Sequence, residues 1–377
     1  MRGDPIAIIR AIKPRLIGYA RAPMSIRAAA LRLSCAGLFA SFALGASCGQ
    51  SALGLFPGVI NDPSNLALRK AILDFGTSKI CGEVLKRSLP LKLREEDPII
   101  GRFHASSCQV APLASGNLAV SFGGFGWVWT NLTQRMSFEA SGSVEYDTDF
   151  LMDGSSMYIY FRQRGTSAAA FKIKLVEQPQ ATAMLGGVNA AAGGQNVANE
   201  LGSQIMRGEI AKGFTVIRQP NGEVEFGLGV IEKGEHPTLP YRLDTKGNAI
   251  LENDRCEIHQ NQRDFIGPIE VPSGAKLDVT LSIDGAPSAD LLVVPRYIGE
   301  PWLQTYTTQA VTTPPPATPT LDETVFSGPI WHRVLTLPPG LYYLVLDNTS
   351  TAGRSAPPGF AKDDRAALVS YAITLED

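Results

Sequence analysis

Three cysteines in the body of the chain, Cys81, Cys108 and Cys256, have side chains that can form a disulfide or bind a metal. Cys81 and Cys108 are nearest to each other in sequence, and a bridge between them would join a predicted helix to the strands that follow it. An alternative is a zinc site, because His104 precedes Cys108 by four residues and His259 follows Cys256 by three. Since the chain carries an export signal, described below, we expect the Cys81–Cys108 disulfide and a free, buried Cys256.

An aromatic segment at residues 123–129 is the second candidate site. If it is a strand, Phe125, Trp127 and Trp129 lie on one face. The apolar residues of 118–122 have the opposite parity, which predicts that the two glycines at 123–124 form a bulge that switches faces. Three aligned rings could line a lipid tunnel or stack against a sugar. The alternative, which the general use of aromatic side chains in cores favours, is a packed core.

The remaining candidates for chemistry are weak. Asp347, Asp363 and Asp364 are loop carboxylates that could hold a calcium ion, although solvated loop carboxylates are the favoured interpretation. The four histidines are isolated from one another in the sequence, and no nucleophile or dinucleotide motif has a suitable context. We therefore expect a protein that is not an enzyme and needs no cofactor.

The first 47 residues predict a secretory signal. Arg21, Arg27 and Arg32 precede an apolar stretch of 15 residues, 33–47, that ends at Cys48. This stretch is shorter than the roughly 20 residues needed to span a bilayer, and its order is basic, then apolar, then small. The segment is expected to direct export and to be removed.

The small residues before Cys48 resemble the lipobox of bacterial envelope lipoproteins. That resemblance implies that the Cys48 thiol takes a diacylglycerol and becomes the new N-terminus, so the protein would be anchored to the outer membrane. A lipobox usually has an aliphatic residue three places before the cysteine, where this chain has Gly45. Cleavage after Gly45 by an ordinary signal peptidase is the alternative, and it would leave a soluble periplasmic or secreted protein.

Composition and charge exclude several classes of protein. The 377 residues are 44% hydrophobic and carry a net charge of −2, which excludes a disordered chain and a polybasic nucleic-acid binder. The leader holds seven basic residues and one acidic residue, so the remainder carries 27 basic and 35 acidic residues, or −8. Membrane attachment would therefore have to come from the lipid anchor, and protein partners cannot be named.

Residues 63–250 predict an α+β domain with two amphipathic helices and a curved antiparallel sheet. The first helix spans 66–85, starts after Asp62-Pro63-Ser64 and is ended by Pro90, and the second lies at 195–212 before Gly213. Between the helices, apolar and polar residues alternate in three stretches, which predicts one buried and one wet face. The buried sets are Met136, Phe138 and Ala140; Met157, Ile159 and Phe161; and Phe171, Ile173 and Leu175.

This order of a long helix ending at Leu89-Pro90 and then a curved sheet resembles the tubular lipid-binding proteins over residues 63–232. The resemblance implies a sheet wrapped around a helix and an apolar tunnel that holds a lipid.

Residues 264–377 predict an all-β sandwich of jelly-roll type. Leu277, Val279, Leu281 and Ile283 alternate with polar residues, and further short strands are separated by Pro-Gly and Asp-Gly turns. The segment 337–347 resembles the penultimate strand of pre-peptidase C-terminal domains, a likeness that covers residues 265–377. It implies a stabilising or targeting module without chemistry of its own.

The domain organisation predicted from the sequence is a signal peptide at 1–47, a tether at 48–62, an α+β domain at 63–250, a linker at 251–263 and the sandwich at 264–377. Two functions remain open. The first is an exported, lipid-anchored protein that binds an apolar ligand in its α+β domain, and the second is a structural or adhesion-type surface lipoprotein that binds protein or glycan partners through the sandwich.

Overall fold

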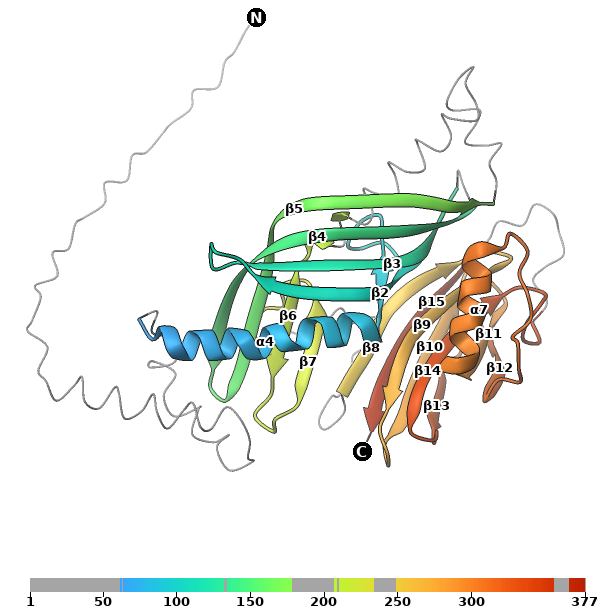
Figure 1. The fold of residues 1–377 in the computed structure, drawn as a ribbon. Coiled ribbons are helices and arrows are strands. Elements are labelled where there is room, and N and C mark those ends of the chain that lie inside the picture. The colour runs from blue at the N-terminus through green and yellow to red at the C-terminus, as the bar shows by residue number, and fades with distance from the viewer. Residues whose placement is uncertain are drawn as a thin grey trace, which may run out of the picture. The chain divides into compact units, whose positions relative to one another are not determined.

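A computed structural model of the chain describes residues 62, 64–131, 134–177, 207–208, 210–233, 249–355 and 366–376. The chain divides into two units, 1–46 and 47–377, and all of the described residues belong to the second unit. The predicted signal peptide, Cys48, most of the tether and the first part of the second predicted helix, 195–206, lie outside the described residues. The described part is mostly β, with two helices, α4 and α7 (Figure 1).

Helix α4 spans Leu66–Lys86, close to the predicted range. The side-chain oxygen of Asp62 accepts hydrogen bonds from the Ser64 amide and hydroxyl just before the helix. Ile72, Gly76, Ile80 and Val84 are buried at a spacing of four residues. Leu66 is 75% exposed and Leu85 is also exposed, so the outward face mixes apolar with charged residues and the predicted amphipathic character is not confirmed.

The prediction that Pro90 ends α4 is wrong. The helix ends at Lys86, and Arg87 already has extended backbone angles. Pro90 lies in strand β1, Ser88–Leu91, opposite Arg102. Because β1 is the first strand in the sheet order, its proline is at an edge, where a missing backbone N–H is tolerated.

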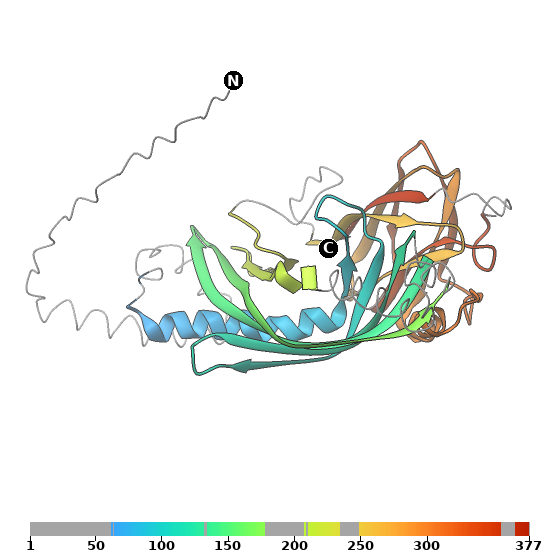
Figure 2. The same cartoon turned by 90° about the horizontal axis from the view of Figure 1, so that it is seen from above.

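The half-barrel is a curled antiparallel sheet in which each strand pairs with the next along the chain (Figure 2). Its seven strands are β1, β2 (Gly101–Pro112), β3 (Leu118–Thr130), β4 (Gln134–Asp153), β5 (Ser156–Val176), β6 (Phe214–Arg218) and β7 (Val224–Leu228). Residues 207–208 and 210–211 are helical, and Gly213 follows with a φ of +74°, so the predicted stop at this glycine is confirmed.

The concave face of the half-barrel covers α4. Ile72, Ile80 and Val84 of the helix share one buried cluster with side chains of β3 to β7. The disulfide between Cys81 and Cys108, which was predicted, joins the helix to β2, and Cys256 is free and buried. Because Cys108 is in the disulfide, it cannot serve as the thiolate ligand of the alternative zinc site.

The prediction of one wet face is wrong along parts of β4 and β5. Arg135 and Ser137 are fully buried, and Tyr158 and Tyr160 pack with Ile217 and Ile231 in a separate apolar cluster on the other side of β5 from Ile159. Leu175 also departs from the predicted alternation. A register shift places it opposite Ser137, while Val176 pairs with Met136, so Leu175 does not share the face of Ile173.

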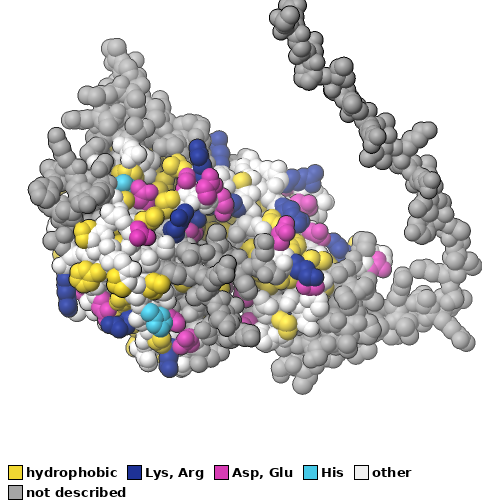
Figure 3. All heavy atoms as spheres, turned by 180° about the vertical axis from the view of Figure 1, so that it is seen from behind, with side chains coloured by type: hydrophobic (Ala, Val, Ile, Leu, Met, Phe, Trp, Pro, Cys, Tyr) yellow, Lys and Arg dark blue, Asp and Glu magenta, His cyan; other side chains and the backbone are white. Residues whose placement is uncertain are grey.

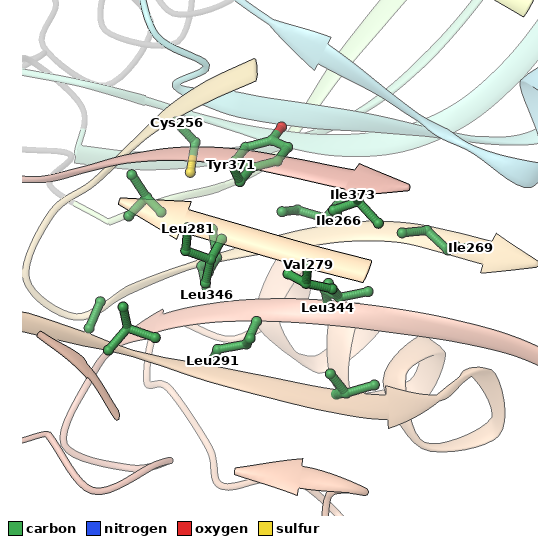
Figure 4. Close-up of a cluster of buried hydrophobic side chains, with 14 of the residues drawn as sticks. Cys256, Ile266, Ile269, Val279, Leu281, Leu291, Leu344, Leu346, Tyr371 and Ile373 are labelled. Atoms are coloured by element: carbon green, nitrogen blue, oxygen red, sulfur yellow. The ribbon is translucent and has the colours of Figure 1, made fainter. Parts of the chain in front are cut away.

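The two-sheet part, β8 to β15, consists of two four-stranded antiparallel sheets with the orders β13-β10-β15-β8 and β12-β11-β14-β9. Its strands are β8 (Ala249–Ile258), β9 (Gln262–Val271), β10 (Lys276–Asp284), β11 (Ser288–Pro295), β12 (Leu321–Phe326), β13 (Trp331–Leu335), β14 (Gly340–Asn348) and β15 (Ala367–Glu376). Side chains of both sheets form one buried cluster, in which the Tyr371 hydroxyl points away from its neighbours (Figure 4). Strand β8 includes residues 251–258 of the predicted linker.

Helix α7, Arg296–Thr308, was not predicted, because Pro301 lies inside it and proline removes a helical hydrogen bond. Packing compensates for this loss. Ile298, Trp302, Leu303 and Tyr306 are buried at helical spacing against β11 and β14.

The disulfide should contribute substantially to stability. Reduction, or a Cys81→Ala/Cys108→Ala variant, is expected to lower the free energy of unfolding by about 3–4 kcal/mol, because the bridge closes a loop with a sequence separation of 27. Urea unfolding with and without reductant measures this difference. A Cys256→Ala variant serves as the control and should keep the sensitivity to reductant. A wild-type unfolding midpoint that reductant leaves unchanged contradicts the prediction.

Candidate functional site

The three aromatic residues of β3 share one face, as predicted, but the predicted bulge is wrong. Strand β3 pairs with β4 in a continuous register from Leu118 to Thr130, and the register shift near this point lies in β2, between Ala105 and Ser107. Because residues in a regular strand alternate between faces, Phe125, Trp127 and Trp129 lie on the convex face and Phe122 lies on the concave face with α4. The apolar residues of 118–122 have the opposite parity because they face the other side of the same regular strand, so no bulge at the two glycines is needed to explain it.

Trp127 joins the half-barrel to the two-sheet part. Its ring makes edge contacts with Phe265 of β9, at 6.0 Å between centroids, and with Tyr306 of α7, at 5.6 Å. The side chain is 3% exposed and belongs to a cluster built mainly from α7, β11 and β14, against which Phe125 also packs. For Trp127 and Phe125, the structure therefore shows the packed core that was the alternative to a ligand site.

Trp129 stacks on His259, which follows β8, with ring centroids 3.3 Å apart. The His259 ring is in turn bound through Nε2 to the Glu257 carboxylate. Next to it, Ile99 donates its amide to the Arg255 carbonyl and accepts from the Glu257 amide, so the chain entering β2 covers part of the β8 edge. We call the contacts made by the convex face of β1 to β4 with the two-sheet part the seam.

Arg102 is the most highly connected charge in the seam. Its Nε and Nη2 donate to the two carboxylate oxygens of Asp264 at 2.6 and 2.9 Å, Nη2 also donates to the Tyr371 hydroxyl at 2.7 Å, and Nη1 donates to Ser88 at 3.0 Å. Both charged side chains are buried. One guanidinium therefore joins strands β1 and β2 to β9 and β15.

Arg135 forms a second buried link. Its Nη2 donates to the carbonyls of Gln309 and Ala310, which directly follow α7, and its guanidinium lies 4.2 Å from the centroid of the Tyr306 ring. Ser137, two residues on, donates to the Thr307 carbonyl. A cation at the carbonyl end of a helix is stabilised by the helix dipole, so Arg135 caps α7.

His104 is buried in the seam without a hydrogen-bond partner for Nε2. Its ring lies 5.8 Å from Phe125 and 5.4 Å from Trp127, between centroids, in stacked orientations. Burial, with a smaller contribution from the Arg102 charge, lowers the pKa of His104 to about 3. The imidazole is therefore neutral at physiological pH.

The calcium candidates are not brought together in the described residues. Asp347 is fully buried in β14 and accepts from Arg263 and from the Thr349 amide and hydroxyl. Burial raises the pKa of Asp347 to about 6, against the opposing effect of the Arg263 charge. Asp363 and Asp364 lie outside the described residues. Within the described ranges no group of three or more His, Cys, Asp or Glu side chains is arranged to hold a metal ion.

The concave face of the half-barrel carries an apolar surface that, unlike the seam, is partly exposed. The Phe138 ring lies 6.4 Å from Phe103 and 4.5 Å from Phe171, so three strands contribute to one aromatic row. Gly126 makes room for this row, because a Cβ there would lie 2.9 Å from the Phe138 ring. Several apolar side chains around this row stay partly exposed. They include Phe122, Ala140, Phe171, Ile173, Val176, Ile210 and Leu228.

Sequence reasoning missed Arg102, Asp264 and Arg135. A signal was present for Arg102, since this charge interrupts the largely apolar run Ile99-Ile100-Gly101 and Phe103. Asp264 follows polar residues 261–263 and gives no such signal. No protein-family model matches the chain, and no curated protein matches it. No helix among the described residues is long and apolar enough to cross a membrane.

The ion pair of Arg102 and Asp264 can be tested by a double-mutant cycle. Arg102→Met is expected to lower the free energy of unfolding by about 3–5 kcal/mol, because it leaves the Asp264 carboxylate buried without its partner. Arg102→Met/Asp264→Leu should recover a large part of that loss.

Urea unfolding of each variant measures these differences. Arg296→Met is the matched control, since Arg296 and Glu300 pair on the surface with side chains 47% and 40% exposed, and it should cost less than about 1 kcal/mol. Additive effects of the two seam substitutions would show that the pair is not coupled.

Proposed function

We propose that this protein is an exported, non-enzymatic lipoprotein of the bacterial envelope, anchored through Cys48, that binds an apolar ligand such as a lipid acyl chain on the concave face of the half-barrel. The observation that supports binding is the partly exposed apolar surface on that face. Apolar side chains of β3, β4, β5 and β7 meet there, and Phe122, Phe171, Ile173 and Leu228 keep part of their surface accessible. Exposed apolar area of this kind is typical of ligand-binding surfaces.

A rigid wall favours binding of a flexible chain, because ordering the protein then costs little free energy. Helix α4 supplies such a wall. The helix is fixed to β2 by the Cys81–Cys108 disulfide, and Arg69 at its start binds Asp149 of β4 at 3.2 Å and covers the Phe150 ring. The order of a long helix followed by a curved sheet is also the basis of the proposed likeness to tubular lipid-binding proteins.

We assign membrane attachment to the lipid on Cys48 and not to a basic surface. Basic and acidic side chains are interspersed over the described part of the face drawn in Figure 3. A surface of mixed sign attracts anionic lipid only weakly, whereas two or more acyl chains give stable anchoring.

For the two-sheet part we propose an eight-stranded jelly roll that stabilises the protein or binds partners. The strand orders support this fold, because both sheets interleave early and late strands: β15 lies between β8 and β10, and β14 lies between β9 and β11. One observation favours the second candidate function, a surface protein with protein or glycan partners. Phe326 and Ile330, at the connection between β12 and β13, are each 64% exposed.

Ligand binding on the concave face is tested by Phe171→Asp. We expect at least a tenfold loss of affinity for a fluorescent long-chain fatty acid, because the change removes a ring contact and places a carboxylate on the apolar surface. Organic extraction of wild-type protein should yield a co-purified lipid that the variant has lost.

Lys172→Asp is the matched control for this experiment. Lys172 is the next residue of β5, lies opposite Glu139 in the register with β4 and points to the opposite, exposed face, so its substitution should leave affinity unchanged. Circular dichroism checks that both variants fold. A wild-type protein that binds no fatty acid, or equal affinities of the two variants, contradicts the proposal.

Anchoring is tested by Cys48→Ser in the full chain expressed in a bacterium. The wild-type protein should fractionate with membranes and lose its signal segment, and its mass should increase by that of the attached acyl groups. The variant should appear in the soluble fraction. Equal fractionation of the two proteins would exclude Cys48 as the anchor.

A further inference from the structure

His104 is a buried titratable side chain that the proposed ligand site does not use. It lies on the convex face of β2, opposite Ser88 of β1 and Phe125 of β3, with its ring between Phe125 and Trp127. The Tyr343 ring of β14 covers it from the two-sheet part, at 6.2 Å between centroids. Because Nε2 has no partner, a proton added there would have no acceptor within the closed seam.

The charges around His104 offer no compensation for a second cation. Arg102, two residues away on the same face of β2, is already positive, and the carboxylate of Asp264 in β9 is engaged in the bidentate pair with it. The titratable group of the two-sheet part that contacts the His104 ring is the Tyr343 phenol, while Tyr306 contacts the neighbouring Trp127. Tyr343 in β14 and Tyr306 in α7 both have pKa values raised by burial and stay neutral. Strands β1 and β3 contribute Ser88, Phe125 and Trp127, which carry no charge.

We propose that the seam is an acid-sensitive contact, in which His104 must be neutral for the half-barrel and the two-sheet part to stay packed together. Protonation would place a second positive charge beside Arg102 in an interface of aromatic rings, so the proton is accommodated only where the seam has opened to water. The proposal goes beyond ligand binding and does not depend on it.

The sign and size of the effect follow from proton linkage. An open seam binds a proton at His104 with an ordinary pKa near 6.5, whereas the closed seam holds the pKa near 3. Between these values the open form binds more protons, so lower pH favours opening. The opening equilibrium constant is expected to rise roughly 25-fold between pH 7 and pH 5 through His104 alone.

Cys256 provides a reporter of opening. The thiol is free and buried, its strand contacts Ile99 at the seam, and the side chain lies near Tyr371, whose hydroxyl accepts from Arg102 (Figure 4). Alkylation of Cys256 by N-ethylmaleimide, quantified on its peptide by mass spectrometry, follows the fraction of open seam under native conditions. Comparing variants at the same pH removes the pH dependence of thiol reactivity.

The test variant is His104→Phe, which keeps an aromatic ring in the stack and removes the titrating group. Relative to His104→Phe, wild-type labelling should accelerate about 25-fold between pH 7 and pH 5. His332→Leu is the matched control, since His332 is an exposed histidine of β13 paired with Asp278, and it should retain the wild-type acid dependence. Equal acid dependence of wild type and His104→Phe overturns the proposal.

A second measurement needs no substitution and covers the case in which His104→Phe does not fold. Nuclear magnetic resonance of histidine-labelled wild-type protein should show one ring that stays neutral down to about pH 4 while the fold persists. A folded protein in which all the histidine rings titrate near pH 6.5 overturns the proposal.

Discussion

The described fold depends on the burial of one charge. The guanidinium of Arg102 is removed from water, and a buried charge is tolerated when its partners are in place. Those partners are Asp264, Tyr371 and Ser88, which come from β9, β15 and β1 and are separated from Arg102 by as many as 269 residues. A shift of the β2 register by one residue would turn both Arg102 and His104 from the convex to the concave face. The ion pair therefore specifies both the register of β2 and the packing of the half-barrel on the two-sheet part.

Local features of the chain could be predicted because they depend on neighbours in sequence. The helical spacing of the apolar residues Leu66, Leu73, Ile80 and Val84 predicted α4, and the parity of Phe125, Trp127 and Trp129 predicted their shared face. The closeness of Cys81 and Cys108 in sequence, together with the expected export, predicted the disulfide. These inferences need only the period of a helix or strand, or the rule that thiols oxidise outside the cytoplasm.

Features that depend on a second layer could not be predicted in the same way. A single strand with alternating residues does not say whether its polar face meets water or another sheet, and Arg135 and Ser137 meet the end of α7. The shift that moves Leu175 to the other face is set by pairing with β4 and not by the alternation of β5 itself. One half of the Arg102–Asp264 pair was accessible in principle, because a charge that interrupts an apolar run, such as Arg102, indicates a buried charge with a partner once two layers are assumed. Asp264 follows the polar residues 261–263, so its burial could not be inferred from its neighbours in sequence.

The order of the strands has a consequence for the sequence of events in which the chain folds. The half-barrel is a meander in which most neighbouring strands are close in sequence, with β5 and β6 as the exception, whereas β8 must wait for the distant β15 before it has a partner in its sheet. Contacts between distant segments form slowly, and an unpaired strand is prone to aggregation in the interval. Until β15 has packed in place, Arg102 also lacks its hydrogen bond to the Tyr371 hydroxyl. The ten residues of β15 thus control the completion of an interface whose buried charge lies near the start of the half-barrel sheet, so the pairing of distant segments, and not the local meander, limits the formation of the complete seam.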